Sequence, residues 1–89
     1  MVLIPVHLRS FERELEKVKK RGYDMSKIKT VMSDLINEKP LDRKHRNHRL
    51  KGNFVGYWEC HVTPDWLLIY KKDDEHIYFA RTGTHSDLF

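Results

Sequence analysis

The stretch CHVTPDWLLIY places two titratable side chains, His61 and Asp65, beside a turn. Arg81 and His85 come near the end of the chain, and His48 precedes the stretch. A free histidine has a pKa of about 6.5, so an imidazole can take up or donate a proton near neutral pH. A guanidinium can hold a phosphate through paired hydrogen bonds, and a carboxylate can orient a histidine or act as a base. These residue types together suit the cleavage of RNA without a metal.

Such cleavage requires that the 2′-hydroxyl lose a proton as it attacks the adjacent phosphate, and that the departing 5′-oxygen gain one. Each candidate also has a simpler interpretation. A single histidine is usually a surface or core residue, an aspartate after proline is often a turn former, and Arg81 could merely end a strand in solvent. Residue types and spacing alone therefore leave an enzyme and a non-catalytic domain both open. His7, His45 and His76 are expected to be ordinary surface or core residues.

A structural zinc site is not expected. Cys60 and His61 are adjacent in a predicted strand, where successive side chains point in opposite directions, so one metal could hardly bind both. The chain has one cysteine, and hence no paired-cysteine spacing. It also lacks a glycine-rich phosphate loop, which argues against a nucleotide-hydrolysing enzyme. We therefore expect no metal and no cofactor.

Length and composition indicate one small globular domain over residues 1–89, with 39% hydrophobic and 34% charged residues. No apolar stretch approaches the roughly 20 residues of a membrane span. The N-terminus lacks the basic lead-in and the cleavage site of a signal peptide. A lone cysteine forms no internal disulfide, which favours a reducing cytoplasm. These features predict a cytoplasmic protein without a membrane partner.

The run RKHRNHRLK, residues 43–51, contains five formal cations and no acid. The whole chain carries a formal net charge of +4 and has a pI near 9.3. A run of this kind can follow a phosphate backbone, or it can be a solvated loop. The candidate RNA-binding cations are Arg43, Lys44, Arg46, Arg49 and Lys51.

Two amphipathic helices are predicted in the first half of the chain. Ser10 is expected to cap the first helix, and Gly22 to end it. Asp24 or Ser26 is expected to cap the second helix, which ends before Pro40. Each helix has one apolar face, so the pair needs a sheet to cover it.

Strand patterns frame this helical hairpin. Residues 2–6 form a short strand, and Pro5 restricts it to an edge or interrupts it. FVGYWECHV, WLLIYKK and HIYFARTG read as three consecutive strands separated by turn residues. The order of one strand, two helices and three strands predicts an α+β fold, a helical hairpin packed on a small antiparallel sheet.

Strand alternation also predicts where the polar side chains lie. His61 and Arg81 are polar residues within otherwise apolar or aromatic strands, so both are expected on the sheet face away from the helices. Simple alternation places Phe79 and Arg81 on one face. His85 follows the last strand on a segment short enough to fold back, and His48 directly precedes the meander. These side chains are therefore expected to converge on one face.

The motifs NHRLKGNFVGYWECHVTPDWLLIYK and RTGTHSDLF resemble the YafQ branch of the RelE/ParE toxin superfamily. The order of the predicted elements agrees with that RelE-like fold, βααβββ, over nearly the whole chain. The histidine-rich set places the chain nearer to YafQ than to RelE. One position departs from the pattern: Trp58 stands where relatives often carry arginine, which implies a missing RNA contact or its replacement by stacking.

The resemblance implies a bacterial toxin of a type II toxin–antitoxin pair. Its YafQ-like members are ribosome-dependent endoribonucleases that cut mRNA in the decoding site of the small ribosomal subunit without metal. A cognate antitoxin would neutralise the toxin, and operator DNA would be bound only through their complex. ParE-type members poison DNA gyrase on the same fold, so a non-nucleolytic gyrase inhibitor stays an alternative, as does a basic nucleic-acid-binding module.

Family positions transferred by the resemblance fall on His48, His61, Asp65, Arg81, His85 and Phe89, with Trp66 as a further RNA-binding candidate. Phe89 is implied by the resemblance alone. In the expected mechanism Arg81 grips the scissile phosphate, and His85 donates the proton to the leaving oxygen. Asp65 and His61 form the base side, and His48 adds charge or positioning.

Overall fold

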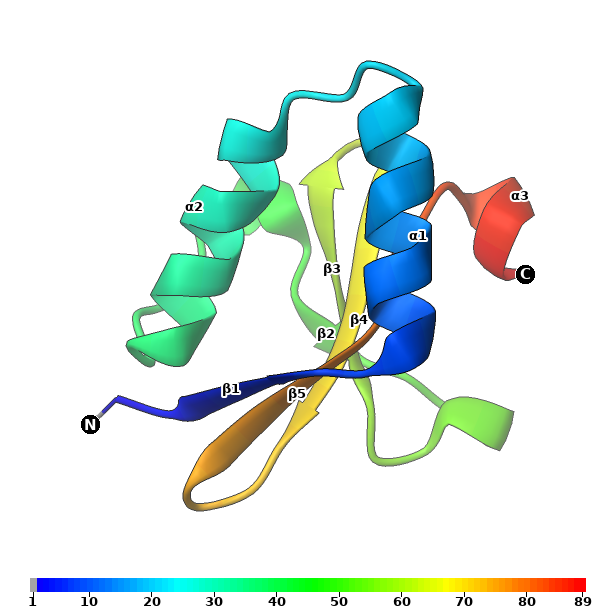
Figure 1. Cartoon of the computed structure of the whole chain (residues 1–89). Coiled ribbons are helices and arrows are strands. Elements are labelled where there is room, and N and C mark those ends of the chain that lie inside the picture. The colour runs from blue at the N-terminus through cyan, green and yellow to red at the C-terminus, as the bar shows by residue number, and fades with distance from the viewer. Residues whose placement is uncertain (1) are drawn as a thin grey trace.

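Two helices cover one face of a five-stranded sheet, and a short C-terminal helix lies at the end of the last strand (Figure 1). The computed structural model describes residues 2–89. The elements are β1 Ile4–His7, α1 Arg9–Lys20, α2 Met25–Ile36, η1 Arg43–His45, β2 His48–Arg49, η2 Gly52–Phe54, β3 Trp58–Thr63, β4 Trp66–Lys72, β5 His76–Gly83 and α3 His85–Leu88, where η marks a 3₁₀ turn. The predicted α+β fold with its βααβββ order is confirmed, with β2, α3 and the 3₁₀ turns as additions.

The sheet is mixed and has the strand order β1-β5-β4-β3-β2. β2, β3, β4 and β5 pair antiparallel, as expected, but β1 pairs parallel to β5. The prediction of a purely antiparallel sheet was therefore wrong at one edge. The prediction that Pro5 belongs to an edge strand is confirmed, because β1 has β5 as its neighbour and ends the sheet.

Backbone hydrogen bonds fix the ends of both long helices. Gly22, with φ of +88°, ends α1 as predicted, and its N–H and that of Tyr23 donate to Lys19 and Val18. Asp24 caps α2 by accepting from the N–H of Ser26 at 3.0 Å. No helix within residues 2–89 combines the length and the apolar character needed to cross a membrane.

The predicted cap of α1 was wrong, because the helix begins one residue before Ser10. Leu8 occupies the N-cap position, and the Ser10 hydroxyl donates to the carbonyl of Ala80 at 2.6 Å instead. β1 pairs only with the first half of β5, so the second half of β5 has a free edge there. Ser10 thus donates to a carbonyl of β5 that lies beyond the end of β1, and this hydrogen bond holds α1 against β5.

The main core lies between the helices and the sheet. Its fully buried side chains come from both layers, including Phe11, Val18, Ile28, Trp66, Leu68 and Phe79. A second, smaller core occupies the other face, where Leu67, Ile69 and Ala80 are covered by Leu88 and the partly buried Leu8, Leu50 and Tyr57. The face away from the helices is therefore not open at its centre, and polar side chains occupy its margins.

A bulge in β5 decides the direction of Arg81. Ile69 pairs with Arg81 and the next residue, Tyr70, pairs with Phe79, so Ala80 is an extra residue in β5. Phe79 therefore faces the helices, while Arg81 lies on the opposite face with Ile69. The expectation that Phe79 and Arg81 share a face was wrong. The expectation that Arg81 points away from the helices holds for its position in the sheet register but not for its guanidinium, which contacts Glu14 of α1.

Candidate active site

Three imidazoles from three elements gather on the sheet face away from the helices. The ring of His61 in β3 lies 6.5 Å from that of His48 in β2 and 6.2 Å from that of His85 in α3, measured between ring centroids. His48 pairs with Glu59 in the sheet, and Glu59 precedes His61 by two residues on the same face. The structure thus brings together the three histidines selected from the sequence.

A buried carboxylate that the sequence reading did not select lies between two of these rings. The Glu59 side chain is 6% exposed, and its Oε1 atom lies 3.4 Å from Nε2 of His48 and 3.7 Å from Nε2 of His61. A buried carboxylate is costly without a cationic or hydrogen-bonding partner. Glu59 is therefore placed to stabilise positive charge that develops on either imidazole during proton transfer. Its sequence signal was a single acid in a strand of aromatic and apolar residues.

Backbone carbonyls orient both rings. Nδ1 of His48 lies 2.6 Å from the carbonyl oxygen of Arg46, and Nδ1 of His61 lies 3.2 Å from that of Pro64. A carbonyl oxygen can only accept, so Nδ1 carries the hydrogen in each ring, and Nε2 of the neutral ring is free to take up a proton. The geometry thus gives each imidazole a base-competent nitrogen facing Glu59.

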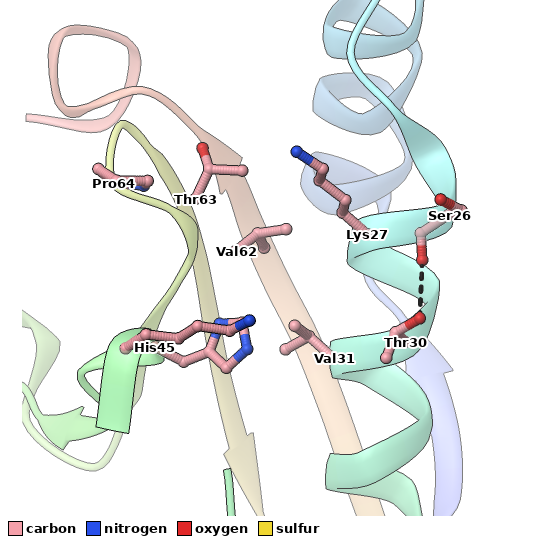
Figure 2. Close-up of a pocket in the computed structure, with 9 residues that line it drawn as sticks. Ser26, Lys27, Thr30, Val31, His45, Val62, Thr63 and Pro64 are labelled. Atoms are coloured by element: carbon pink, nitrogen blue, oxygen red, sulfur yellow. Dashed lines mark hydrogen bonds between the residues drawn. The ribbon is translucent and has the colours of Figure 1, made fainter. Parts of the chain in front are cut away.

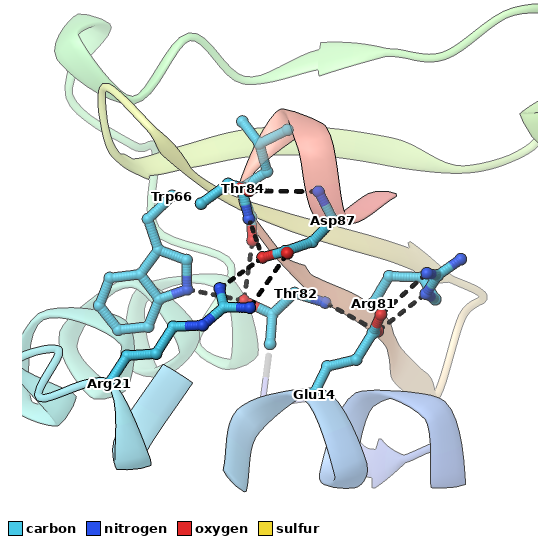
Figure 3. A network of polar contacts seen from close by, with 8 residues as sticks. Glu14, Arg21, Trp66, Arg81, Thr82, Thr84 and Asp87 are labelled. Atoms are coloured by element: carbon cyan, nitrogen blue, oxygen red, sulfur yellow. Dashed lines mark hydrogen bonds and ion pairs between the residues drawn. The ribbon is translucent and has the colours of Figure 1, made fainter. Parts of the chain in front are cut away.

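Arg81 lies on the same face but across the sheet from the histidines. The register runs from Arg81 through Ile69 to Glu59, which separates the backbones of Arg81 and Glu59 by about 10 Å. The Nε and Nη2 atoms of Arg81 donate to the two carboxylate oxygens of Glu14 in α1, at 2.8 Å each (Figure 3). These hydrogen bonds raise the pKa of Arg81. One edge of the guanidinium is thereby occupied, and the Nη1–Nη2 edge keeps its donors for a phosphate.

Glu14 is therefore expected to position Arg81. Glu14→Gln keeps the size of the side chain but removes the negative charge and one of the two oxygens that accept from Arg81. We expect roughly 3- to 10-fold lower kcat for RNA cleavage, with little change in melting temperature. Cleavage kinetics and a thermal melt of the same preparation measure both. Glu16→Gln, an exposed neutral substitution on the same helix, is the control. Equal kinetics in the two variants would remove Glu14 from the site.

Polar contacts of Asp87 shape α3 and hold it, and with it His85, against the end of α1. Thr84 and Asp87 form a reciprocal capping box, and the Arg21 guanidinium donates to Asp87 at 2.7 and 3.1 Å (Figure 3). The hydrogen bond from Arg21 holds the pKa of the Asp87 carboxyl well below its ordinary value. A Cβ at Gly83 would meet Asp87 at 3.0 Å, so glycine permits this close packing.

Phe89, implied by the resemblance alone, lies beside His85. Its ring is 5.8 Å from that of His85 and 5.6 Å from that of Phe54 in η2, and the residue is 58% exposed. Exposed aromatic faces can stack on unpaired bases. Phe89 therefore adds an apolar wall to the imidazole cluster, and the spacing of residues in the sequence gave no signal for it.

Asp65 and Trp66 are adjacent in the sequence, but the structure exposes the side chain of Asp65 and buries that of Trp66. Asp65 lies exposed in the turn between β3 and β4, and no hydrogen bond or ion pair joins its carboxylate to the described histidines. Trp66 is 1% exposed, packs against Tyr23 and donates from its indole to the Thr82 hydroxyl at 2.8 Å. The expectation that Trp66 contacts RNA was wrong, because its ring is sealed in the main core.

The basic segment lies next to the imidazoles and is tied to them. Nδ1 of His45 lies 2.6 Å from the carbonyl oxygen of His61, which fastens η1 to β3. His45 was expected to be an ordinary residue, and this contact gives it a positioning role. The five selected cations, Arg43, Lys44, Arg46, Arg49 and Lys51, are all exposed. The guanidinium of Arg49 lies 5.1 Å from the ring centroid of Trp58. Trp58, which stands where relatives often carry arginine, therefore stacks on a side chain of this protein.

A groove of about 490 Å³ lies on the other side of η1, between α2 and the end of β3 (Figure 2). Val31 and Val62 form its apolar floor, and Thr30 on its wall donates to the carbonyl of Ser26 at 3.0 Å. Val62 belongs to the core on the helix side of the sheet. The groove is therefore separate from the imidazole cluster.

Within the part of the chain that the structure describes, no three histidine, cysteine or acidic side chains are grouped so that they could hold a metal ion. Cys60 is fully buried on the helix side, and burial raises the pKa of its thiol to about 12. It is a packing residue of the main core.

Comparisons with known proteins agree with this arrangement. Residues 5–89 match the family model described as bacterial toxin of type II toxin–antitoxin system, YafQ. The mRNA interferase toxin YafQ of Escherichia coli strain K12 is 44% identical over 80 residues, which cover 89% of this chain and 87% of that protein.

Solved structures extend the likeness to three dimensions. The crystal structure of YafQ from E. coli strain BL21(DE3) has a TM-score of 0.93 and 39% identity, covering 98% of each chain. The E. coli DinJ–YafQ toxin–antitoxin complex matches with a TM-score of 0.92 and 39% identity, covering 100% of this chain and 99% of that chain. The chain therefore belongs to the YafQ family of bacterial toxins of type II toxin–antitoxin systems.

Proposed function

We propose that this protein is a metal-independent mRNA interferase that cleaves mRNA by attack of the 2′-hydroxyl on the adjacent phosphate. The observation that carries the proposal is the gathering of His48, His61 and His85 on one sheet face, with the buried Glu59 beside the first two. Proton transfer in both directions needs such groups, and it needs no metal. The similar E. coli protein named mRNA interferase toxin YafQ supports the same activity.

The base side of the reaction lies at His61. Its Nε2 atom takes the proton from the 2′-hydroxyl, and Glu59 stabilises the resulting imidazolium. Asp65 lies in the adjacent turn and would orient the imidazole or the nucleotide when RNA is bound. His48, whose Nε2 atom faces the same carboxylate, adds positive charge next to the phosphate.

The acid side of the reaction lies at His85. The 2′-oxygen forms a bond to phosphorus, the bond to the 5′-oxygen breaks, and His85 donates a proton to that oxygen. Arg81 stabilises the charge on the phosphate through its free guanidinium edge, and Phe89 stacks on a neighbouring base. The products are a 2′,3′-cyclic phosphate and a 5′-hydroxyl.

The proposed setting is the translating ribosome, in the cytoplasm. The exposed cations of residues 43–51 would contact ribosomal RNA phosphates and bring the imidazole cluster to mRNA in the decoding site. A cognate antitoxin is the proposed protein partner, because a toxin of the same fold has been solved in complex with the antitoxin DinJ. Operator DNA would be bound through that complex.

Mapping of mRNA 5′ ends after induction in bacteria tests this function. Cuts within translated message, with the new 5′ ends bearing hydroxyl groups, are expected in the absence of antitoxin. Intact message together with DNA damage would identify a gyrase inhibitor instead. Intact message, unaltered growth and salt-sensitive RNA binding would identify a non-catalytic binding module.

A further inference from the structure

Three side chains form a row across the sheet on the same face as the imidazole cluster. Lys71 in β4 pairs with Tyr78 in β5, and Trp58 pairs with Tyr70, which places Tyr57 next to Lys71 on the other side. The Nζ atom of Lys71 lies 5.2 Å from the ring centroid of Tyr57 and 5.6 Å from that of Tyr78. Tyr57, Lys71 and Tyr78 thus form one continuous strip, here called the Tyr–Lys–Tyr row, with the lysine between the two rings.

The charge of this lysine is available to a ligand. Lys71 is exposed, both tyrosines are partly exposed, and no carboxylate among the described residues forms an ion pair with Lys71. The adjacent Lys72 differs, because its side chain reaches Glu38 beyond α2 at 3.9 Å. Neighbouring lysines of one strand therefore point to opposite faces, and only Lys71 shares the face of the histidines.

The row lies one step along the sheet from the proposed reaction centre. Arg81, Ile69 and Glu59 form the preceding row on this face, two residues away along β4, a separation of about 7 Å. This separation is comparable to that between successive phosphates of an extended single strand. α3 lies at the opposite end of β5 from the β4–β5 turn (Figure 1), and Lys71 is exposed.

We propose that the Tyr–Lys–Tyr row is a subsite for single-stranded RNA, which holds a nucleotide flanking the scissile phosphate. Lys71 binds the backbone phosphate, and Tyr78 offers its ring to the base. Tyr57 keeps the lysine extended and contacts Phe54 of η2, which in turn contacts Phe89. This inference rests on the proposed nuclease function, because the row extends the path of the same substrate.

The subsite ends at the β4–β5 turn. The carboxylate of Asp73 accepts a hydrogen bond from the Tyr78 hydroxyl at 3.2 Å, and two further acids, Asp74 and Glu75, follow. These charges repel a phosphate backbone, so the strand must leave the surface before the turn. We therefore assign one flanking nucleotide to the row rather than a longer track.

Binding of a short single-stranded RNA, made uncleavable by 2′-O-methyl groups, tests the subsite in the full-length protein. Lys71→Gln is expected to weaken binding roughly 3- to 10-fold at moderate salt and to reduce the slope of log affinity against log salt by about 0.7. Tyr78→Leu keeps an apolar side chain but removes the stacking surface, and is expected to weaken binding at least about five-fold. Lys72→Gln, which removes the same charge from the opposite face, should bind like the unaltered protein.

Equal affinities and salt slopes for Lys71→Gln and Lys72→Gln would overturn the assignment, and so would absence of RNA binding by the unaltered protein. Thermal melts of all variants confirm that each compared protein is folded. The 5′-end mapping of the unaltered protein separates this inference from the function on which it rests. Normal cleavage with equal affinities refutes the subsite alone, whereas absence of cleavage refutes the nuclease.

Discussion

Replacing His85 with alanine is expected to slow mRNA cleavage by about 10²–10⁴-fold, the usual contribution of a general acid. His85 is exposed on α3, 6.2 Å from the ring of His61, so its removal takes a proton donor from the cluster without opening the core. Induction of the variant in bacteria measures the loss as restored growth. Cleavage of a defined message on purified ribosomes measures it as a rate.

His76→Ala is the matched control for this experiment. His76 begins β5 at the far end from α3, and its ring faces Asp73 in the β4–β5 turn at 3.5 Å. Its loss should leave cleavage within about two-fold of the unaltered rate, as is usual for surface substitutions. His45, which from sequence would have served equally well, is unsuitable because its ring contacts the carbonyl of His61. Full toxicity of folded His85→Ala would remove His85 from the mechanism.

Replacing Trp66 with alanine is expected to lower the free energy of unfolding by roughly 3–5 kcal/mol, the range for a large aromatic side chain removed from a core. Trp66 is 1% exposed, packs on Tyr23 and donates to Thr82. A domain of this size has little stability to spare, so much of the variant should be unfolded at growth temperature. Urea unfolding followed by circular dichroism measures the change.

The same variant separates a structural role of Trp66 from a role in RNA binding. A toxicity assay alone would report loss of function for either reason. At low temperature, the fraction of Trp66→Ala that stays folded should bind single-stranded RNA as the unaltered protein does. The partly buried Trp58, which carries Arg49 on its face, provides a comparison, and Trp58→Ala should cost less stability. A stable Trp66→Ala that has lost RNA binding would contradict the buried placement.

Contacts within the protein already fix the candidate catalytic side chains on both sides of the site. Carbonyl groups and Glu59 fix the rings of His48 and His61 before any RNA is present. Arg81 is restrained from the other side by Glu14. A phosphate has to lie between these groups, because about 10 Å of sheet separates their backbones. Binding energy from flanking contacts, such as those proposed for Lys71, would hold the substrate across that span.

Local patterns along the chain were enough to predict most of the elements. The segments WLLIYKK and HIYFARTG correspond to β4 and β5, because continuous apolar and alternating runs are strong strand signals. Gly22 and Asp24 fixed helix ends through hydrogen bonds made within a few residues, by backbone groups at Gly22 and by the side chain of Asp24. The motifs around His48, His61 and His85 also indicated the family that the comparisons show.

The tertiary structure alone decided the features that depend on partners distant in the chain. The extra residue Ala80 in β5 separates the directions of Phe79 and Arg81, and no two-residue period can reveal a bulge. The parallel pairing of β1, the contact of Glu14 with Arg81 and the burial of Trp66 each join segments that are far apart in sequence. The sequence gives the chemical type of each side chain directly. The neighbours that orient, pair or bury that side chain come from distant segments and are set by tertiary packing.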